Sequence, residues 1–134
     1  PAGIENAQGI IVALYRKDAS DPQWAQSPDV LAWRAFMAKY MPQADLRDDG
    51  HNYGFCVMHT LLQTLKQAGD NLTRENVMKE AANLKGYEAP LLIPGIKINT
   101  SPTDFFPLQS MQLARVKGES FELFGQVISN EASS

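Results

Sequence analysis

The most apolar part of the chain is the segment from Tyr53 to Leu65, in which only four positions are polar. Its apolar residues do not form one narrow stripe at helical spacing but extend around most of the helix. Such a pattern is typical of a helix that is enclosed by other elements. Gly69 follows as a C-terminal stop, because glycine readily adopts the left-handed conformation found there. The pattern therefore predicts a helix over about residues 51–68 that is buried on all sides.

Two further helices are predicted from their start and stop signals. Ser27 is followed by Pro and Asp, which favour the first turn of a helix, and apolar residues at helical spacing continue to Tyr40. Pro42 ends this helix because it cannot donate a backbone hydrogen bond. Thr73 is a good N-cap for a third helix, which we expect to end at Gly86.

The remaining segments have the periodicity of strands and loops. Residues 9–16 form an apolar run rich in β-branched residues, which predicts an interior strand with a neighbour on each side. Such neighbours are hard to find within this chain. Four prolines exclude regular helix over 90–107, where residues 95–99 resemble a short edge strand. Residues 108–128 alternate around a turn at 117–119, which predicts a β-hairpin.

Composition and charge narrow the class of protein. The 134 residues are 44% apolar and 20% charged, as expected for one globular domain with a real core. The formal net charge of −3 and the scattered basic residues argue against a nucleic-acid partner. No signal-peptide pattern and no apolar run of membrane-spanning length is present. The chain begins at Pro1, consistent with loss of an initiator Met or with a start inside a longer chain.

Candidate catalytic and metal-binding groups are few. Cys56, the single cysteine, lies three residues before His59, but a thiol nucleophile also needs a group that orients its base. We interpret Cys56 as a small core residue. The cysteine and histidine spacing does not match a metal site, and the acidic residues Asp45, Asp48 and Asp49 lack the spacing of a calcium loop. The sequence therefore predicts no cofactor and no metal ligands.

The start of the apolar helix is the better candidate for a binding site. His51, Asn52 and Tyr53 place polar and aromatic groups beside the free backbone N–H groups of a helix N-terminus. Such groups can line a cleft for a small molecule. The alternative, that Tyr53 only caps the core and His51 faces solvent, remains open.

The order of four segments resembles a known family. These segments are "GIIVALYRKD", "DVLAWRAFMAKYMP", "YGFCVMHTLLQTLKQAGDNLTRENVMKEAANLKG" and "PLLIPGIKINTSPTDFFPLQSMQLARVKGESFELFG". Together they resemble the C-terminal third of a type I periplasmic solute-binding protein, in the branch of the branched-chain amino-acid (Leu/Ile/Val-binding) receptors of ABC transporters.

The resemblance implies an α/β fold that is part of a two-lobed receptor: a strand, three helices, a Pro-rich crossover and a terminal β-hairpin. Residues 1–26 would end a second-lobe segment and cross over, and residues 27–89 would form a helical segment of the first lobe. Residues 90–134 would cross back and form the second-lobe hairpin. The remaining N-terminal part of the receptor would then cover the apolar helix and flank the first strand.

The resemblance also implies a function. Such a receptor captures a small solute in the periplasm and passes it to a permease, without covalent chemistry and hence without enzymatic activity. His51, Asn52 and Tyr53 match positions near the cleft and are the expected ligand contacts in this chain. The groups that clamp the ligand lie upstream in the family, whose members take amino acids, amides, urea or aromatic acids. We expect a solute of the amino-acid or aromatic-acid class, and its identity stays open.

Three other functions are compatible with the residues. A sensor domain of the same fold would carry a signalling or DNA-binding segment beside it. A small enzyme would use Cys56 and His59 and would need a reactive thiol. A self-associating interaction module would complete its apolar helix with a second copy.

Overall fold

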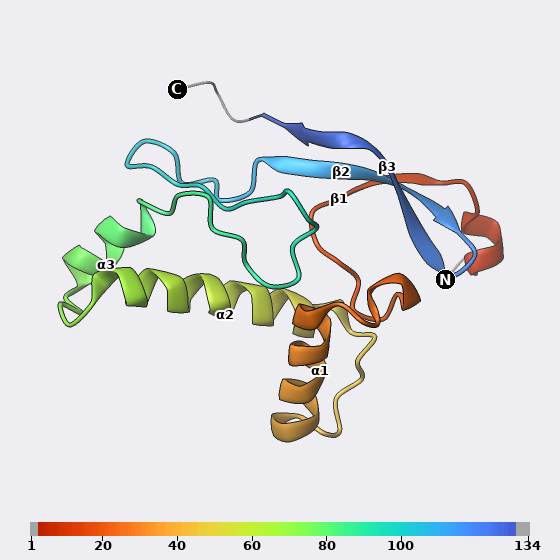
Figure 1. Cartoon of the computed structure of the whole chain (residues 1–134), viewed down its shortest axis with the longest axis horizontal. Coiled ribbons are helices and arrows are strands. Elements are labelled where there is room, and N and C mark those ends of the chain that lie inside the picture. The colour runs from red at the N-terminus through yellow and green to blue at the C-terminus, as the bar shows by residue number, and fades with distance from the viewer. Residues whose placement is uncertain (1–2, 131–134) are drawn as a thin grey trace.

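The computed structural model describes residues 3–130 and contains a sheet on one side and helices on the other (Figure 1). The order of elements confirms the expected α/β class, with a strand, three helices, an irregular Pro-rich segment and a terminal hairpin. The elements are the short 3₁₀ turn Ile4–Ala7, β1 Ile11–Leu14, the 3₁₀ turn Pro22–Trp24, α1 Pro28–Tyr40, α2 Asp49–Ala68, α3 Arg74–Ala81, β2 Ser110–Lys117 and β3 Ser120–Ser129.

The sheet is antiparallel, with the strand order β1-β2-β3. β1 therefore lies at an edge, and among the described residues only β2 pairs with it. Ile11 is 55% exposed. The strand predicted within residues 9–16 is present at Ile11–Leu14, and in the described part of the chain it has a neighbour on one side only, as expected if the second neighbour lies outside this chain. Its interior position stays a prediction for the complete protein.

The predicted β-hairpin is confirmed. β2 and β3 are joined at Gly118, whose φ of 61° is one that glycine adopts without strain. Val116 pairs with Phe121 and Ala114 with Leu123, while the register shifts between Met111 and Leu113. The short edge strand expected over residues 95–99 is absent, since this stretch makes only an isolated bridge through Ile98.

α1 begins and ends where its signals predict. Ser27 precedes its first residue, although the Ser27 hydroxyl makes no capping bond and instead accepts a hydrogen bond from Lys17. On the inner face Val30, Trp33 and Met37 are fully buried. The outer part of the stripe is exposed. In Figure 1 the helix projects away from the rest of the molecule.

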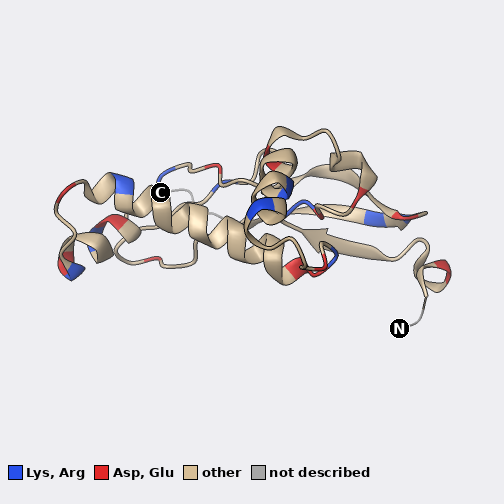
Figure 2. Cartoon of the chain, turned by 90° about the horizontal axis from the view of Figure 1, so that it is seen from below, with Lys and Arg blue, Asp and Glu red and all other residues tan. Residues whose placement is uncertain are grey.

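α2 differs from its prediction in burial rather than in length. It ends before Gly69, as expected, and Asp48 caps its start by accepting from the Gly50 N–H. However, the helix is buried on one side only, and its opposite side exposes large apolar residues. Figure 2 shows charged groups near the ends of α2 and few between them. α3 is capped by Thr73 as predicted but ends at Ala81, earlier than Gly86.

Two segments connect the sheet to the helices, and they run side by side. Residues 15–17 form the first crossing segment and residues 91–93 the second. The Lys17 N–H donates to the Leu91 carbonyl at 2.8 Å, and the Ile93 N–H donates to the Tyr15 carbonyl at 3.0 Å. Through this short antiparallel pairing, the two crossing segments form one connection between two parts of the chain. We call the three strands the sheet unit and the three helices the helical unit.

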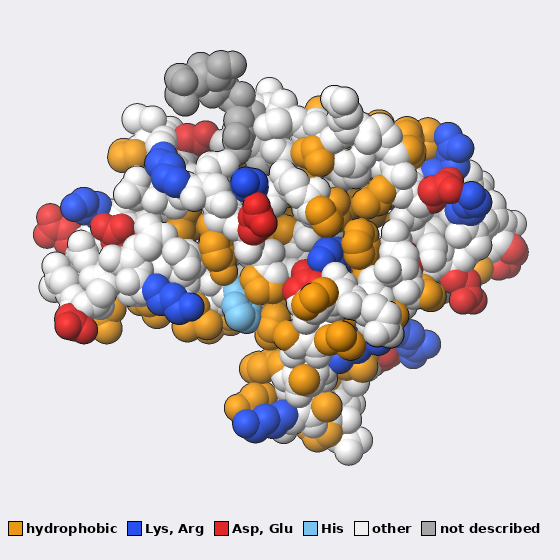
Figure 3. Space-filling view, in the orientation of Figure 1, with side chains coloured by type: hydrophobic (Ala, Val, Ile, Leu, Met, Phe, Trp, Pro, Cys, Tyr) orange, Lys and Arg blue, Asp and Glu red, His pale blue; other side chains and the backbone are white. Residues whose placement is uncertain are grey.

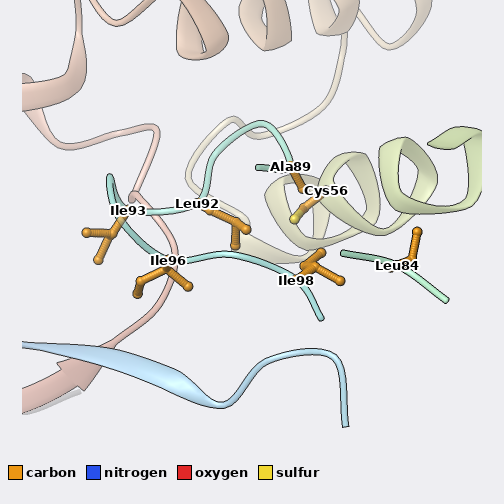
Figure 4. Packing of buried hydrophobic residues seen from close by; sticks show 7 residues of the cluster. All are labelled: Cys56, Leu84, Ala89, Leu92, Ile93, Ile96 and Ile98. Atoms are coloured by element: carbon orange, nitrogen blue, oxygen red, sulfur yellow. The ribbon is translucent and has the colours of Figure 1, made fainter. Parts of the chain in front are cut away.

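Each crossing segment is also anchored in a hydrophobic core. Leu91 packs against the inner face of α1, whereas Leu92 and Ile93 belong to a second cluster between α2 and the sheet. The members of this second cluster are drawn in Figure 4: Cys56, Leu84, Ala89, Leu92, Ile93, Ile96 and Ile98. Successive side chains of the second crossing segment therefore enter two different cores.

Candidate functional site

The three residues expected to contact a ligand lie in the first turns of α2, but their side chains diverge. Asn52 is only 2% exposed, Tyr53 is 53% exposed, and His51 is half-buried beside α1. The divergence follows from helix geometry, because consecutive residues are about 100° apart around the axis. The structure therefore places Tyr53 alone of the three on an open surface.

Asn52 has an unusual environment for a buried amide. Its Oδ1 atom has no hydrogen-bond partner among the described residues. Cys56, one turn further along the same helix, is also buried. A buried polar atom without a partner is costly, roughly 1–3 kcal/mol, so such atoms are normally paired with another group.

Arg16, in the first crossing segment, makes the central contact beside Tyr53. Its two terminal nitrogens donate to Asp49 Oδ1 at 3.1 Å and Oδ2 at 2.7 Å. Its guanidinium carbon lies 5.3 Å from the ring centre of Tyr15 and 5.4 Å from that of Tyr53. The pair therefore ties the start of α2 to the crossing segment and holds a cation against two aromatic rings.

The charge state of Arg16 is secured by its partners. Burial alone would lower its pKa, but the hydrogen bonds to Asp49 and Tyr15 outweigh it and the pKa is raised. Arg16 Nε is buried and has no partner among the described residues. Sequence reasoning missed this contact, since Arg16 and Asp49 are 33 positions apart and no local pattern links them.

A hollow of about 240 Å³ opens next to this pair, between the sheet unit and the helical unit. We call it the crossover pocket. Its charged groups are of both signs and its walls include aromatic rings, which suits a small polar solute with an apolar portion. It is lined by Ala13, Leu14, Tyr15, Arg16, Lys17, Asp18, Arg47, Asp49 and Phe121.

The loop after the first crossing segment is tied back to the hairpin. Asp21 is buried, and its carboxylate accepts from the Ser120 hydroxyl at 2.8 Å and from the Phe121 N–H at 2.9 Å. Burial would raise the pKa of Asp21, but the hydrogen bonds from Phe121 and Gln23 hold it below its usual value. Phe121, a wall of the crossover pocket, is thus fixed in place.

The outer side of α2 carries two apolar hollows. One, of about 530 Å³, lies between α1 and α2, and the other, of about 450 Å³, lies between α2 and the loops of residues 81–108. Figure 3 shows hydrophobic side chains gathered where α1 meets α2. The exposed apolar residues of α2, which we call the open face, are Tyr53, Val57, Met58, Leu61 and Leu62.

The other candidate groups do not assemble a reactive site. Cys56 lies in the second core cluster, and burial raises the pKa of its thiol, which disfavours the reactive thiolate. The His59 ring packs on Phe55, with ring centres 4.5 Å apart. Asp45 pairs with Arg47 on the surface, and this partner lowers the pKa of Asp45 to about 2.

Within residues 3–130, no three His, Cys, Asp or Glu side chains are grouped as a metal ion would require. None of the helices in the same range is both long enough and apolar enough to cross a membrane.

Comparison with known proteins gives one family and one fold. The family model described as periplasmic binding protein matches residues 1–120. None of the curated proteins matches the chain. A crystal structure described as a branched chain amino acid ABC transporter from Thermus thermophilus with bound valine is similar over 95% of this chain, with a TM-score of 0.73 and 14% sequence identity. The match spans 35% of that chain, and identity at this level shows a shared fold alone.

Proposed function

The chain belongs to the periplasmic binding protein family, and from this membership we propose that it is part of a two-lobed extracytoplasmic receptor. The receptor captures a small solute between its lobes and delivers it to an ABC transporter permease. The function is binding and transport, and it requires no covalent step from the residues of this chain.

The observation that carries the proposal is the paired crossing segments at residues 15–17 and 91–93. Two units joined by short extended connections can open and close as rigid bodies. We assign residues 1–26 to a second-lobe segment and crossover, and residues 27–89 to the first lobe. Residues 90–134 then form the return crossover and the second-lobe hairpin.

We propose that the solute binds beside the crossover pocket, with Tyr53 as an aromatic wall. We also propose His51 and Asn52 as contacts, which requires the first turn of α2 to reorient when solute binds, because Asn52 is 2% exposed and His51 faces α1 in this structure. Tyr53 is exposed and lies against Arg16, which lines the crossover pocket together with charged groups of both signs. A charged solute with an apolar side group, such as an amino acid or an aromatic acid, fits these surroundings. Valine bound to the structurally similar transporter protein supports the amino-acid class.

We further propose that the remaining N-terminal part of the receptor covers the open face of α2. Full burial of a large apolar side chain contributes roughly 1.5–3 kcal/mol, so five exposed residues favour a packed partner. The same part of the receptor would provide the missing neighbour of β1.

The test of solute capture compares two tyrosine variants of the complete receptor. We expect Tyr53→Ala to weaken binding of the preferred solute about tenfold, roughly 1.4 kcal/mol, without unfolding the protein. Tyr40→Ala is the matched control, because Tyr40 is similarly exposed but lies at the far end of α1. Titration calorimetry with L-valine, L-phenylalanine and benzoate measures both. Equal affinities for the two variants would contradict the role of Tyr53.

The open face also favours a second function, self-association of this chain. In that case α2 would pack against α2 of a second copy. Sedimentation of the complete receptor distinguishes the two: a monomer that binds solute supports the receptor, and a dimer that dissociates on Leu61→Asp supports self-association.

A further inference from the structure

Asp29, in the first turn of α1, is bonded to both crossing segments at once. Its two carboxylate oxygens accept from Lys17 Nζ at 2.9 and 2.8 Å, and Oδ2 also accepts from the Leu91 N–H at 2.9 Å. Lys17 belongs to the first crossing segment and Leu91 to the second. One carboxylate therefore joins α1 to both connections between the units.

We infer that Asp29 is a positioning residue for solute capture, because it locks both crossing segments to the helical unit. In the second crossing segment the two units then turn about bonds on its sheet side, at Pro94 and Gly95. The inference rests on the proposed function, in which the units close on a solute.

The Lys17 contact is held firmly. Lys17 is only 8% exposed, and its ammonium group also donates to the Ser27 hydroxyl at 3.0 Å and lies 5.2 Å from the ring centre of Trp24. An ion pair removed from water in this way is screened little by salt, and removing one partner leaves a buried charge without compensation. The first crossing segment is thus fixed to α1 at Lys17.

The Leu91 contact fixes the backbone itself. Leu91 has a φ of 68°, and within residues 3–130 it is the only residue other than glycine with a positive φ. Its side chain is fully buried against α1, its N–H donates to Asp29, and its carbonyl accepts from the Lys17 N–H. A strained conformation persists only when its surroundings determine it completely. The second crossing segment therefore cannot rotate at Leu91 without breaking all three contacts.

The backbone on the sheet side of the second crossing segment is less constrained than the backbone at Leu91. The Ile96 N–H donates to the Ile93 carbonyl at 3.0 Å, which closes a turn with Pro94 and Gly95 in its middle. Pro94 and Gly95 are both exposed, and Gly95 has a φ of 91°. Hinges are formed by a few residues that can absorb large changes in backbone angles, and a glycine in an exposed turn satisfies this condition.

The first experiment follows backbone amide exchange in the complete receptor, without solute and with saturating L-valine, L-phenylalanine or benzoate. We expect the Leu91 amide to exchange at about the same rate in both states. The amides of Gly95 and Ile96 should change about fivefold or more when solute binds. A change at Leu91 as large as that at Gly95 would overturn the inference, and this outcome needs no variant.

The second experiment uses Asp29→Asn, which keeps the shape of the side chain and removes its charge. We expect exchange at Leu91 to accelerate about tenfold and solute binding to weaken about three- to tenfold. Lys17→Met, which keeps the apolar stem, should give the same acceleration at Leu91 and replaces Asp29→Asn if that variant does not fold; its affinity is not compared, because Lys17 lines the crossover pocket. A purely structural role would lower the unfolding midpoint and leave affinity unchanged below the transition.

The matched control is Glu88→Gln. Glu88 lies on the same stretch of chain, but its carboxylate is exposed and pairs with Lys97 at 3.0 Å. It should leave Leu91 exchange and affinity unchanged. The two failures are distinguishable: absence of solute binding by the wild-type receptor refutes the proposed function, whereas unaltered Leu91 exchange in both Asp29→Asn and Lys17→Met refutes the lock.

Discussion

The two long helices differ in how far this chain buries their large apolar side chains. α1 buries Val30, Trp33 and Met37 completely, against Leu91 from the second crossing segment. α2 buries mainly small or polar side chains within the chain and leaves its larger apolar ones on the open face. The buried residues of α2 are Asn52, Cys56, Thr64 and Ala68. The chain thus completes the inner face of α1 by itself but does not complete α2.

This difference shows that an apolar pattern in a sequence predicts burial without identifying the packing partner. Apolar residues indicate that a surface is to be covered, and they do not indicate which segment covers it. The α1 face is covered by residues distant in this sequence, whereas the open face of α2 is proposed to be covered by the rest of the receptor. Substitutions on the two helices should therefore respond differently to the presence of that remaining part.

The largest effect is expected for Trp33→Ala in the complete receptor. The buried indole fills the α1 core, and its loss should lower the free energy of unfolding by about 3–5 kcal/mol through lost transfer energy and a cavity. Urea unfolding measures the change. A loss below about 1 kcal/mol would show that α1 is not completed within this chain.

A smaller effect should distinguish the two exposed surfaces directly. Leu61 on α2 and Leu31 on α1 are 43% and 46% exposed in this structure. In the complete receptor we expect Leu61→Asp to lose about 2–4 kcal/mol, because its charge would be buried under the covering part. Leu31→Asp should change stability by less than about 0.5 kcal/mol. Equal urea midpoints for the two variants would contradict the proposal that the rest of the receptor covers the open face.

Acid should reduce the stability that Asp29 contributes at the start of α1, and it should not affect the contribution of the open face of α2. Burial would raise the pKa of Asp29, but the hydrogen bonds from Lys17 and Leu91 outweigh it and the pKa is lowered from 3.8. A carboxylate with a lowered folded pKa stabilises the fold above its unfolded pKa, and this contribution is lost as pH falls through the folded value, here below about pH 4.

Asp29→Asn should therefore show a shallower loss of urea midpoint between pH 4 and pH 2 than the wild type. Leu61→Ala is the comparison, since no Asp or Glu lies between Gly50 and Ala68. Its shift should be the same at pH 4 and pH 2. An Asp29→Asn profile parallel to the wild-type profile would contradict the lowered pKa.

The smallest effect is expected for Arg47→Ala. Arg47 pairs with Asp45 at 2.9 Å on the surface of the connector, and both side chains are exposed. Exposed pairs contribute little because water and salt screen them. We expect no measurable change in the urea midpoint, and a clear shift would place this connector against another part of the receptor.

The sequence predicts well those features that depend on neighbours along the chain. Gly69 and Thr73 mark the end of α2 and the start of α3, and Gly118 marks the hairpin turn. Each acts through backbone conformation or a local cap. The resemblance in segment order extended this local information to the fold and to its family.

Contacts between distant residues were not predictable in the same way. The bond from Arg16 to Asp49 and the bond from Asp29 to Leu91 join positions 33 and 62 residues apart, and neither has a periodic signal. The sequence pattern places Leu91 only within a Pro-rich segment, although its buried position and positive φ make it central to the crossing. The divergence of Asn52 from Tyr53 likewise depends on how α2 is oriented against the core.

Cys56 provides a chemical probe of motion that the molecule carries already. It is the one thiol in this sequence, and it is packed under the second crossing segment with Leu92 and Ile98 (Figure 4). Cys56 is only 5% exposed, so a thiol reagent should react with it mainly when α2 and the loops beside it move apart, and the labelling rate reports such openings in the folded protein. The rate at which the core beside the second crossing segment opens can thus be measured in solution without introducing another cysteine.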